Sequence, residues 1–300
     1  MKRRALLAGA AALAVGSRPR LGEAKTLESA ELSLIELQLA GDAAFGRALL
    51  AVPRTLPPEP ELLVLLHGLG ETTEQTLGAH AFAERYGLLT AVSRLSHPPL
   101  ALLDPKHDYF GEGRLDELNA RLAVRPFRCP VVVCPFTPNT YKPGGDEVLV
   151  RFASFVSGQL KAEVEQRTGV GFPSSRFMVA GVSLGGYLAI ELFLRQPEAY
   201  CGLCTAQGAF GPRQAARYAA GVEQATRRVG PRRVEVLTSS FDPYRRQNEQ
   251  FHRYLCQKGQ ASRLRVSPGP HDQRWLNESG VIEMLLSAED VFAGQRGAAQ

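Results

Sequence analysis

The chain has 300 residues, of which 44% are hydrophobic and 22% charged, a balance that suits one large globular domain or two small ones. No stretch is long and apolar enough for a transmembrane span of the mature protein. Residues 1–24 hold five of the 35 basic residues and only one of the 30 acidic ones, so the rest of the chain is nearly neutral. The sequence therefore shows no basic patch that would indicate nucleic-acid binding, and we predict no nucleic-acid partner.

The first 24 residues have the pattern of an export signal. Lys2, Arg3 and Arg4 precede a mildly apolar run at 5–16 that is rich in alanine and glycine. A charged start followed by a short apolar run is typical of a secretory signal, and paired arginines are typical of the twin-arginine type. We predict a periplasmic or extracellular protein with cleavage after Ala24. General secretion is the alternative route.

Residues 25–300 are predicted to form a single α/β domain in which strands and helices alternate. We expect strands at 32–40, 45–53, 61–68, 129–135, 174–181, 201–207, 233–240 and 262–268. We expect helices at 78–95, 148–166, 185–196, 212–229, 247–259 and from residue 274 onward. Apolar strands that alternate with helices indicate a mainly parallel sheet with helices on both faces. In such sheets, functional residues gather where the strands end.

The segment between the first expected helix, at 78–95, and the next strand is rich in prolines and glycines. We expect residues 96–128 to be irregular, because helix-breaking residues recur along them. The wider segment 93–128 is predicted to be an insert near the active site. It lies between the strand at 61–68 and the next strand, so it is expected to emerge above the strand ends and to cover or line the pocket for the acyl group. An ordinary surface connection is the alternative.

A serine lies in a glycine cluster between an expected strand and an expected helix. Gly181-Val182-Ser183-Leu184-Gly185 matches the pattern G-x-S-x-G, and Gly186 follows directly. A nucleophilic serine must project from a tight strand-to-helix turn, where larger neighbours would clash. The start of the helix also places partial positive charge near a developing oxyanion. The context therefore predicts that Ser183 is a nucleophile.

A base and an acid for this serine follow in the order Ser183, Asp242, His271. Asp242 comes after the strand at 233–240, and His271 comes after the last strand. This is the chain order of the hydrolase type of serine triad, in which the histidine accepts the serine proton and the carboxylate orients it. Asp272 and Asp290 are weaker candidates for the acid.

The strand at 61–68 ends in His67-Gly68-Leu69, which places backbone amides near the serine. We expect the N–H groups of Leu69 and Leu184 to form an oxyanion hole. His67 is expected to be a hydrogen-bonded structural side chain rather than a base.

The five cysteines have no finger-like partner spacing, so we predict no metal site, and the chain shows no cofactor motif. Cys201 and Cys204 lie in an apolar run and are expected to be small buried side chains. A disulfide between Cys129 and Cys134 is possible in an exported protein.

Four stretches together resemble a known family: "LLHGLGE", "MVAGVSLGGYLAIELFLRQPEAY", "FDPYRRQNEQFHRYLCQKG" and "PGPHDQRW". They are similar to esterase D-like esterases of the α/β-hydrolase superfamily, over about Leu62 to Leu286. The resemblance implies an α/β-hydrolase fold and hydrolysis of carboxylic esters through an acyl-enzyme, without metal or cofactor.

The sequence therefore predicts a serine carboxylesterase that acts on a small-molecule, carbohydrate or lipid ester. Two alternatives stay open. One is an acyltransferase on the same fold, because an alcohol can also accept the acyl group. The other is a non-catalytic binding protein that keeps the shell of a hydrolase.

Overall fold

A computed structural model describes residues 29–40 and 44–298 of the chain. The predicted export signal, residues 1–24, lies outside these described residues. The described part contains a single sheet of eight strands, in the order β1-β2-β4-β3-β5-β6-β7-β8. The strands are β1 (Leu32–Gln38), β2 (Arg47–Pro53), β3 (Leu62–Leu66), β4 (Val131–Pro135), β5 (Phe177–Val182), β6 (Gly202–Ala206), β7 (Arg233–Phe241) and β8 (Ser262–Pro270).

The sheet is mainly parallel, as predicted. β2 pairs antiparallel with both β1 and β4, while every pair from β4 to β8 is parallel. All eight expected strands are present. The carboxyl ends of β3, β5, β6, β7 and β8 therefore meet along one edge, which is where functional residues are expected.

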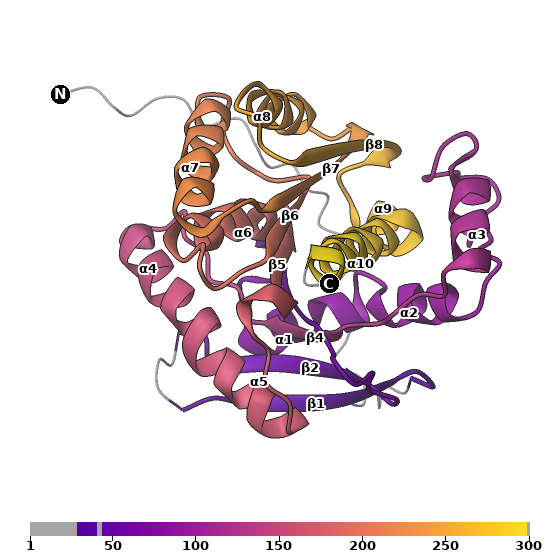
Figure 1. Cartoon of the computed structure of the whole chain (residues 1–300), viewed down its shortest axis with the longest axis horizontal. Helices are drawn as coiled ribbons and strands as arrows, with labels where there is room; N and C mark the ends of the chain where they lie inside the picture. Colours follow the sequence, from indigo (N-terminus) through magenta and orange to yellow (C-terminus); the bar gives the residue numbers. More distant parts are fainter. Residues whose placement is uncertain (1–28, 41–43, 299–300) are drawn as a thin grey trace.

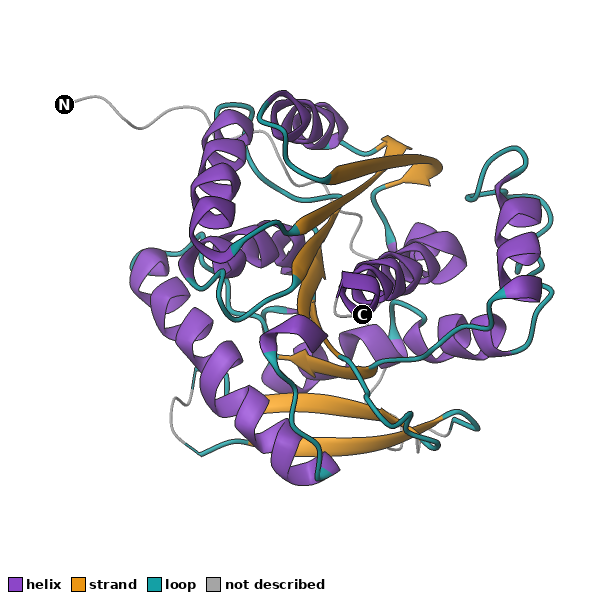
Figure 2. Cartoon of the chain, viewed as in Figure 1, coloured by secondary structure: helices purple, strands orange, loops and turns teal. Residues whose placement is uncertain are grey.

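Helices cover both faces of the sheet (Figure 1; Figure 2 shows the strands in orange between them). The α-helices are α1 (Gln75–Glu84), α2 (Leu88–Ser96), α3 (Arg114–Val124), α4 (Gly145–Phe155), α5 (Lys161–Thr168), α6 (Leu184–Arg195), α7 (Gln214–Val229), α8 (Arg245–Gln257), α9 (Gln273–Trp275) and α10 (Val281–Ala298). Short 3-10 turns η1 (Leu69–Glu71) and η3 (Ser174–Arg176) and π turns η2 (Val156–Leu160) and η4 (Leu276–Gly280) complete them. None of the described helices combines the length and the apolar character needed to cross a membrane.

Two hydrophobic cores lie on the two faces of the sheet, and successive residues of a strand enter alternate cores. In β3, Leu62, Val64 and Leu66 pack against the layer of α4 to α8, whereas Leu63 and Leu65 pack against α1, α2, α3 and α10. Because side chains of a strand point alternately to opposite faces, a strand with both faces covered must be apolar throughout. This explains the unbroken apolar run that marks β3 in the sequence.

The expectation of an irregular segment at 96–128 is wrong for its second half. Residues 114–124 form α3, which buries Leu118 and Leu122 one turn apart. Gly113 directly before the helix has a φ of 71°, a left-handed conformation that suits glycine. The expected helix at 78–95 is likewise two helices, α1 and α2, separated at Gly87, whose φ is 81°.

The five cysteines are all free thiols. Cys201, directly before β6, and Cys204, within it, are buried, as predicted for small apolar side chains. Cys129 and Cys134, considered above as a disulfide pair, are not bonded to each other. Burial raises the pKa of the Cys129 thiol to about 12, so this thiol is held in its neutral form.

Ion pairs attach α3 to the C-terminal helix α10. Arg114 donates from Nε to Glu283 Oε1 at 2.7 Å and from Nη2 to Oε2 at 2.8 Å, a bidentate contact. Two turns further along each helix, Arg121 lies 2.7 Å from both Glu289 and Asp290. The inserted segment is therefore fixed to the body of the domain by buried charge pairs.

Removing Arg114 is expected to destabilise the protein, because it leaves the buried Glu283 with only a longer contact to Arg265. Breaking a buried pair from one side typically costs about 3–5 kcal/mol. Arg114→Met should lower the free energy of unfolding in urea by about that amount, and the control Arg227→Met by less than about 1 kcal/mol. Arg227 is exposed and pairs with Glu223 on the surface of α7. Equal losses in the two variants would show that the α3–α10 contact does not stabilise the fold.

Candidate active site

Ser183 occupies a strained turn between β5 and α6. Its φ is 56° and its ψ is −117°, in a region that side chains other than glycine rarely adopt. Only two described residues other than glycine have a positive φ, and Ser183 is one of them. The turn ends the buried strand and starts the helix, which is the context that the motif requires.

The glycines of the motif allow this turn to pack tightly. A Cβ on Gly181 would overlap the carbonyl oxygen of Gly185 across the turn, and a Cβ on Gly185 would overlap the carbonyl oxygen of Leu66 at the end of β3. Gly186 faces Thr205 on β6, where a Cβ would lie 2.9 Å from the hydroxyl oxygen. Backbone atoms leave no room at the first two positions, so glycine is required there for steric reasons.

The structure brings the three residues of the predicted triad together. Nε2 of His271 lies 3.0 Å from Oγ of Ser183, and Nδ1 of His271 lies 2.9 Å from Oδ1 of Asp242. Asp242 follows β7 and His271 follows β8, so all three stand at carboxyl ends of parallel strands. A proton on Nδ1 and a lone pair on Nε2 are the tautomer that this arrangement favours.

Asp242 is held by contacts that sequence reasoning did not identify. Its Oδ2 accepts a hydrogen bond from the Thr238 hydroxyl at 2.6 Å, and its Oδ1 also accepts from the Tyr244 amide at 2.9 Å. The carboxylate is fully buried beside a histidine ring that is 22% exposed. These bonds fix the side chain so that one oxygen faces His271.

The two weaker candidates for the acid have other partners. Asp272 caps α9, where it accepts a hydrogen bond from the Trp275 amide at 3.0 Å. Asp290 lies on α10 in contact with Arg121, Arg125 and Arg263. Of the three carboxylates, Asp242 is the one that contacts His271.

The predicted oxyanion donors both start a helical turn near Ser183. Leu184 is the first residue of α6, and Leu69 is the first residue of η1. The turn containing Leu69 is close, because a Cβ on Gly68 would lie 3.7 Å from Cβ of Ser183. Within residues 29–40 and 44–298, neither amide donates a hydrogen bond to the protein. Both N–H groups are therefore left without a hydrogen-bond partner among the described residues.

His67 is a structural side chain, as predicted. It is fully buried, its Nε2 accepts from the Thr137 amide at 2.8 Å, and its Nδ1 lies 2.8 Å from the carbonyl oxygen of Gly68. These bonds join the end of β3 to the end of β4. Burial lowers the pKa of His67 to about 4, because the charged form is poorly solvated there.

Gln207 is a further residue of the site that sequence reasoning missed. It follows β6, is fully buried, and has a φ of 48°, the second positive value outside glycine. Its side-chain amide donates to the Ser239 hydroxyl at 2.7 Å and to the Pro270 carbonyl at 2.9 Å. It therefore supports the backbone directly before His271. A polar residue followed by glycine after a buried strand was the available signal.

Aromatic side chains surround the three residues. The ring of Tyr244 lies edge-on to the His271 ring, with centroids 5.6 Å apart. Tyr109, from the inserted segment, packs so closely on Gly269 that a Cβ there would lie 2.7 Å from the ring. The hydroxyl of Tyr141 donates to the carbonyl of Ala209 at 2.6 Å. One part of the segment 93–128 thus reaches the loop that carries His271.

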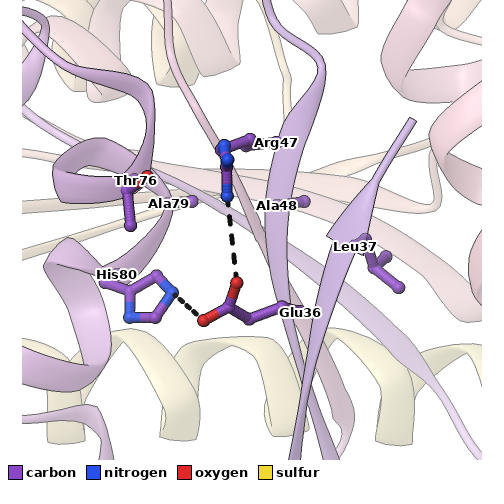
Figure 3. A pocket seen from close by; sticks show the side chains of 7 residues that line it. All are labelled: Glu36, Leu37, Arg47, Ala48, Thr76, Ala79 and His80. Atoms are coloured by element: carbon purple, nitrogen blue, oxygen red, sulfur yellow. Dashed lines mark ion pairs between the residues drawn. The ribbon is translucent and has the colours of Figure 1, made fainter. Parts of the chain in front are cut away.

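A separate shallow pocket lies at the antiparallel edge of the sheet, three strands away from β5 (Figure 3). Glu36 pairs there with His80 at 3.4 Å and with Arg47 at 3.9 Å. The carboxylate of Glu36 faces the guanidinium of Arg47 there, and the hollow measures only about 150 Å³ together with the solvent at its mouth. No group of three or more potential metal ligands occurs among the described residues.

The strand order and the turn at Ser183 define an α/β-hydrolase fold.

No protein-family model and no curated protein matches the sequence. Solved structures do match its fold. A ferulic acid esterase is 15% identical, with 87% of this chain and 98% of that chain covered and a TM-score of 0.59. The S-formylglutathione hydrolase of Staphylococcus aureus is 14% identical, with coverage of 87% and 98% and a TM-score of 0.53. A feruloyl esterase module from Clostridium thermocellum, complexed with sinapinate, is 13% identical, with coverage of 84% and 87% and a TM-score of 0.55. The predicted fold is confirmed.

The depressed pKa of His67 predicts a loss of stability in acid. In the unfolded chain the pKa is about 6.5, so the unfolded state binds this proton more readily than the folded state. The stabilisation is complete above that value and is lost as the pH falls toward about 4. The shift corresponds to about 3 kcal/mol.

His67→Gln keeps an acceptor for the Thr137 amide but does not titrate. The difference in unfolding free energy between wild type and this variant should therefore shrink by about 3 kcal/mol between about pH 7.5 and about pH 4.5. The control His97→Gln, at an exposed position, should keep the acid sensitivity of the wild type. A constant difference between wild type and His67→Gln across this range would contradict a buried neutral His67.

Proposed function

We propose that the protein is a serine hydrolase of carboxylic esters, with Ser183 as nucleophile, His271 as base and Asp242 as the orienting acid. The observation that carries this proposal is the continuous chain of hydrogen bonds from Ser183 Oγ through His271 to Asp242. The side chain of His271 is 22% exposed and Ser183 is partly exposed, so the pair is not sealed in the core. The esterases among the structural neighbours support the same reaction class.

In the proposed mechanism, Ser183 Oγ attacks the ester carbonyl while its proton passes to Nε2 of His271. The tetrahedral oxyanion accepts hydrogen bonds from the amides of Leu69 and Leu184. Collapse breaks the bond to the alcohol, which leaves with the proton from His271. Water then attacks the acyl-enzyme by the same steps in reverse order, releasing the acid and restoring Ser183.

Asp242 favours this sequence by holding the proton on Nδ1 and by stabilising the imidazolium that forms. The hydrogen bonds from Thr238 and from the Tyr244 amide keep the carboxylate in place while the charge on His271 changes. We also propose that Tyr109 and its neighbours in the segment 93–128 line the substrate pocket, because they contact the loop of His271.

The substrate class is a carboxylic ester of a small molecule, carbohydrate or lipid. A panel of p-nitrophenyl esters of increasing chain length, feruloyl esters and acetylated sugars would identify the acyl group. Adding an alcohol acceptor to the same assays distinguishes hydrolysis from acyl transfer, because transfer yields a new ester in place of the free acid.

Ser183→Ala should fold normally and lower kcat by about 10⁴- to 10⁶-fold, because it removes the nucleophile. A fluorophosphonate probe should label the wild type at Ser183 and leave the variant unlabelled. A variant that keeps more than about a tenth of the rate would contradict the assignment. An unlabelled and inactive wild type would instead favour a binding protein.

Asp242→Asn should lower kcat by about 10⁴-fold, since the neutral amide favours the wrong histidine tautomer. Asp272→Asn is the control, because that carboxylate caps α9 and does not contact His271. Activity should survive in the control. Normal turnover in Asp242→Asn would assign the acid role to another group.

We propose that residues 1–24 direct export of the folded protein by the twin-arginine route. Replacing Arg3 and Arg4 together by lysine keeps the charge and removes the paired signal. The variant should accumulate as an uncleaved precursor with esterase activity, whereas the wild type is processed after Ala24. Continued export of the double-lysine variant would favour general secretion.

A further inference from the structure

A buried tyrosine and a buried glutamate that take no part in the proposed chemistry lie at the turn η1, which begins with Leu69. We call this the oxyanion turn, because Leu69 is a proposed oxyanion donor. Tyr86 follows α1 and is 4% exposed, and Glu71 ends η1 and is also 4% exposed. The Tyr86 ring packs edge-on against Phe82, with centroids 5.1 Å apart, so its direction is fixed by the core. A buried carboxylate is costly unless it is paired, which makes its placement here informative.

The Tyr86 hydroxyl bridges the residues on either side of Leu69. Its oxygen accepts a hydrogen bond from the Gly68 amide at 3.3 Å, and its proton is donated to Oε2 of Glu71. Gly68 immediately precedes Leu69, and Glu71 closes the short 3-10 turn that Leu69 begins. One side chain therefore holds both ends of the turn.

This bridge occupies the amide of Gly68 and leaves that of Leu69 without a partner in the described part of the chain. The Gly68 N–H is taken up by Tyr86, while the Leu69 N–H donates to none of the described residues. A phenol has a single proton, and here that proton goes to Glu71, so Tyr86 is not itself an oxyanion donor. Burial and the nearby carboxylate raise the pKa of Tyr86 well above its ordinary value, which keeps that proton in place.

The bridge is in turn attached to the body of the domain. Arg85 pairs with the other oxygen of Glu71 at 3.3 Å, and the Arg85 carbonyl accepts a hydrogen bond from Asn277 at 2.7 Å. Glu71 is thus a charged acceptor with a fixed position. A charged acceptor forms a stronger hydrogen bond than a neutral one.

We propose that Tyr86 and Glu71 are positioning residues that hold the Leu69 amide toward Ser183. This inference rests on the proposed function, because it assigns a role in stabilising the oxyanion of that reaction. Displacing a catalytic donor by about 1 Å costs about 100-fold in rate, and losing one costs about 10²- to 10³-fold in kcat. Loss of the bridge should therefore slow the chemical step without weakening substrate binding.

The decisive variant is Tyr86→Phe, which keeps the ring packing and removes only the hydroxyl. The matched control is Tyr200→Phe, because Tyr200 is fully buried and its hydroxyl has no hydrogen-bond partner among the described residues. Tyr200 precedes β6, at the opposite end of the strand from the site. Glu71→Gln is a conservative third variant, whose amide oxygen still accepts from Tyr86 without the charge.

Each variant is assayed with p-nitrophenyl acetate for kcat and KM, and with phenylboronic acid for its inhibition constant. The boronate forms a tetrahedral adduct with a serine oxygen, so its affinity reports the oxyanion site. Tyr86→Phe should lower kcat by about 10- to 100-fold with KM within about twofold, and should weaken the boronate in parallel. Glu71→Gln should fall between Tyr86→Phe and wild type, and Tyr200→Phe should equal wild type.

The proposal is overturned if Tyr86→Phe keeps the kcat of Tyr200→Phe, or if its loss appears in KM with boronate binding unchanged. Should Tyr86→Phe fail to fold, Glu71→Gln carries the test alone, and unchanged kcat and boronate affinity in that variant overturn the proposal. Ser183→Ala separates the two levels of inference. If that variant still hydrolyses the ester, the proposed function fails, whatever Tyr86 shows.

Discussion

The site depends on one close approach of backbone, where the first turn of α6 packs against the end of β3. A Cβ on Gly185 would overlap the carbonyl oxygen of Leu66, so the helix reaches this position only because residue 185 is glycine. The approach places Ser183 beside Gly68 and brings the starts of α6 and η1 together. Ser183 and the amides of Leu69 and Leu184, the proposed oxyanion donors, thus derive their spacing from a single steric constraint.

Around this contact, uncharged side chains join several backbone segments, and charge pairs attach the outer helices. His67 joins two strand ends as an uncharged ring, and Gln207 supports the backbone before His271 with its amide. The charge pairs of Arg114 and Arg121 lie on the outer helices, away from the serine.

Much of this was predictable from the sequence, because the signals are local. The eight strands appear as apolar runs, and the glycines around Ser183 indicate a turn with no room for side chains. The order of Ser183, Asp242 and His271 follows from the parallel topology, since each comes directly after a strand. The structure brings these three together as predicted.

The missed features depend on contacts between distant residues. α3 lies in the segment expected to be irregular because of its prolines and glycines, and the helix buries only Leu118 and Leu122 and is attached largely by acids on α10. The Tyr86–Glu71 contact joins residues to which the sequence gives no role, and its position beside the site is visible only once Gly68 is known to lie next to Ser183. Local periodicity does not encode which distant charges or hydroxyls will meet.

The C-terminal helical segment explains how these distant contacts are coordinated. Asn277 in η4 holds the carbonyl of Arg85 next to Tyr86, and Glu278 accepts from Arg94 and from the amide of Leu103 in the inserted segment. One stretch of helix therefore contacts both the insert that carries Tyr109 and the residues beside the oxyanion turn. The same stretch also begins a few residues after His271. Such a common attachment keeps the parts of the site in register although they come from separate loops.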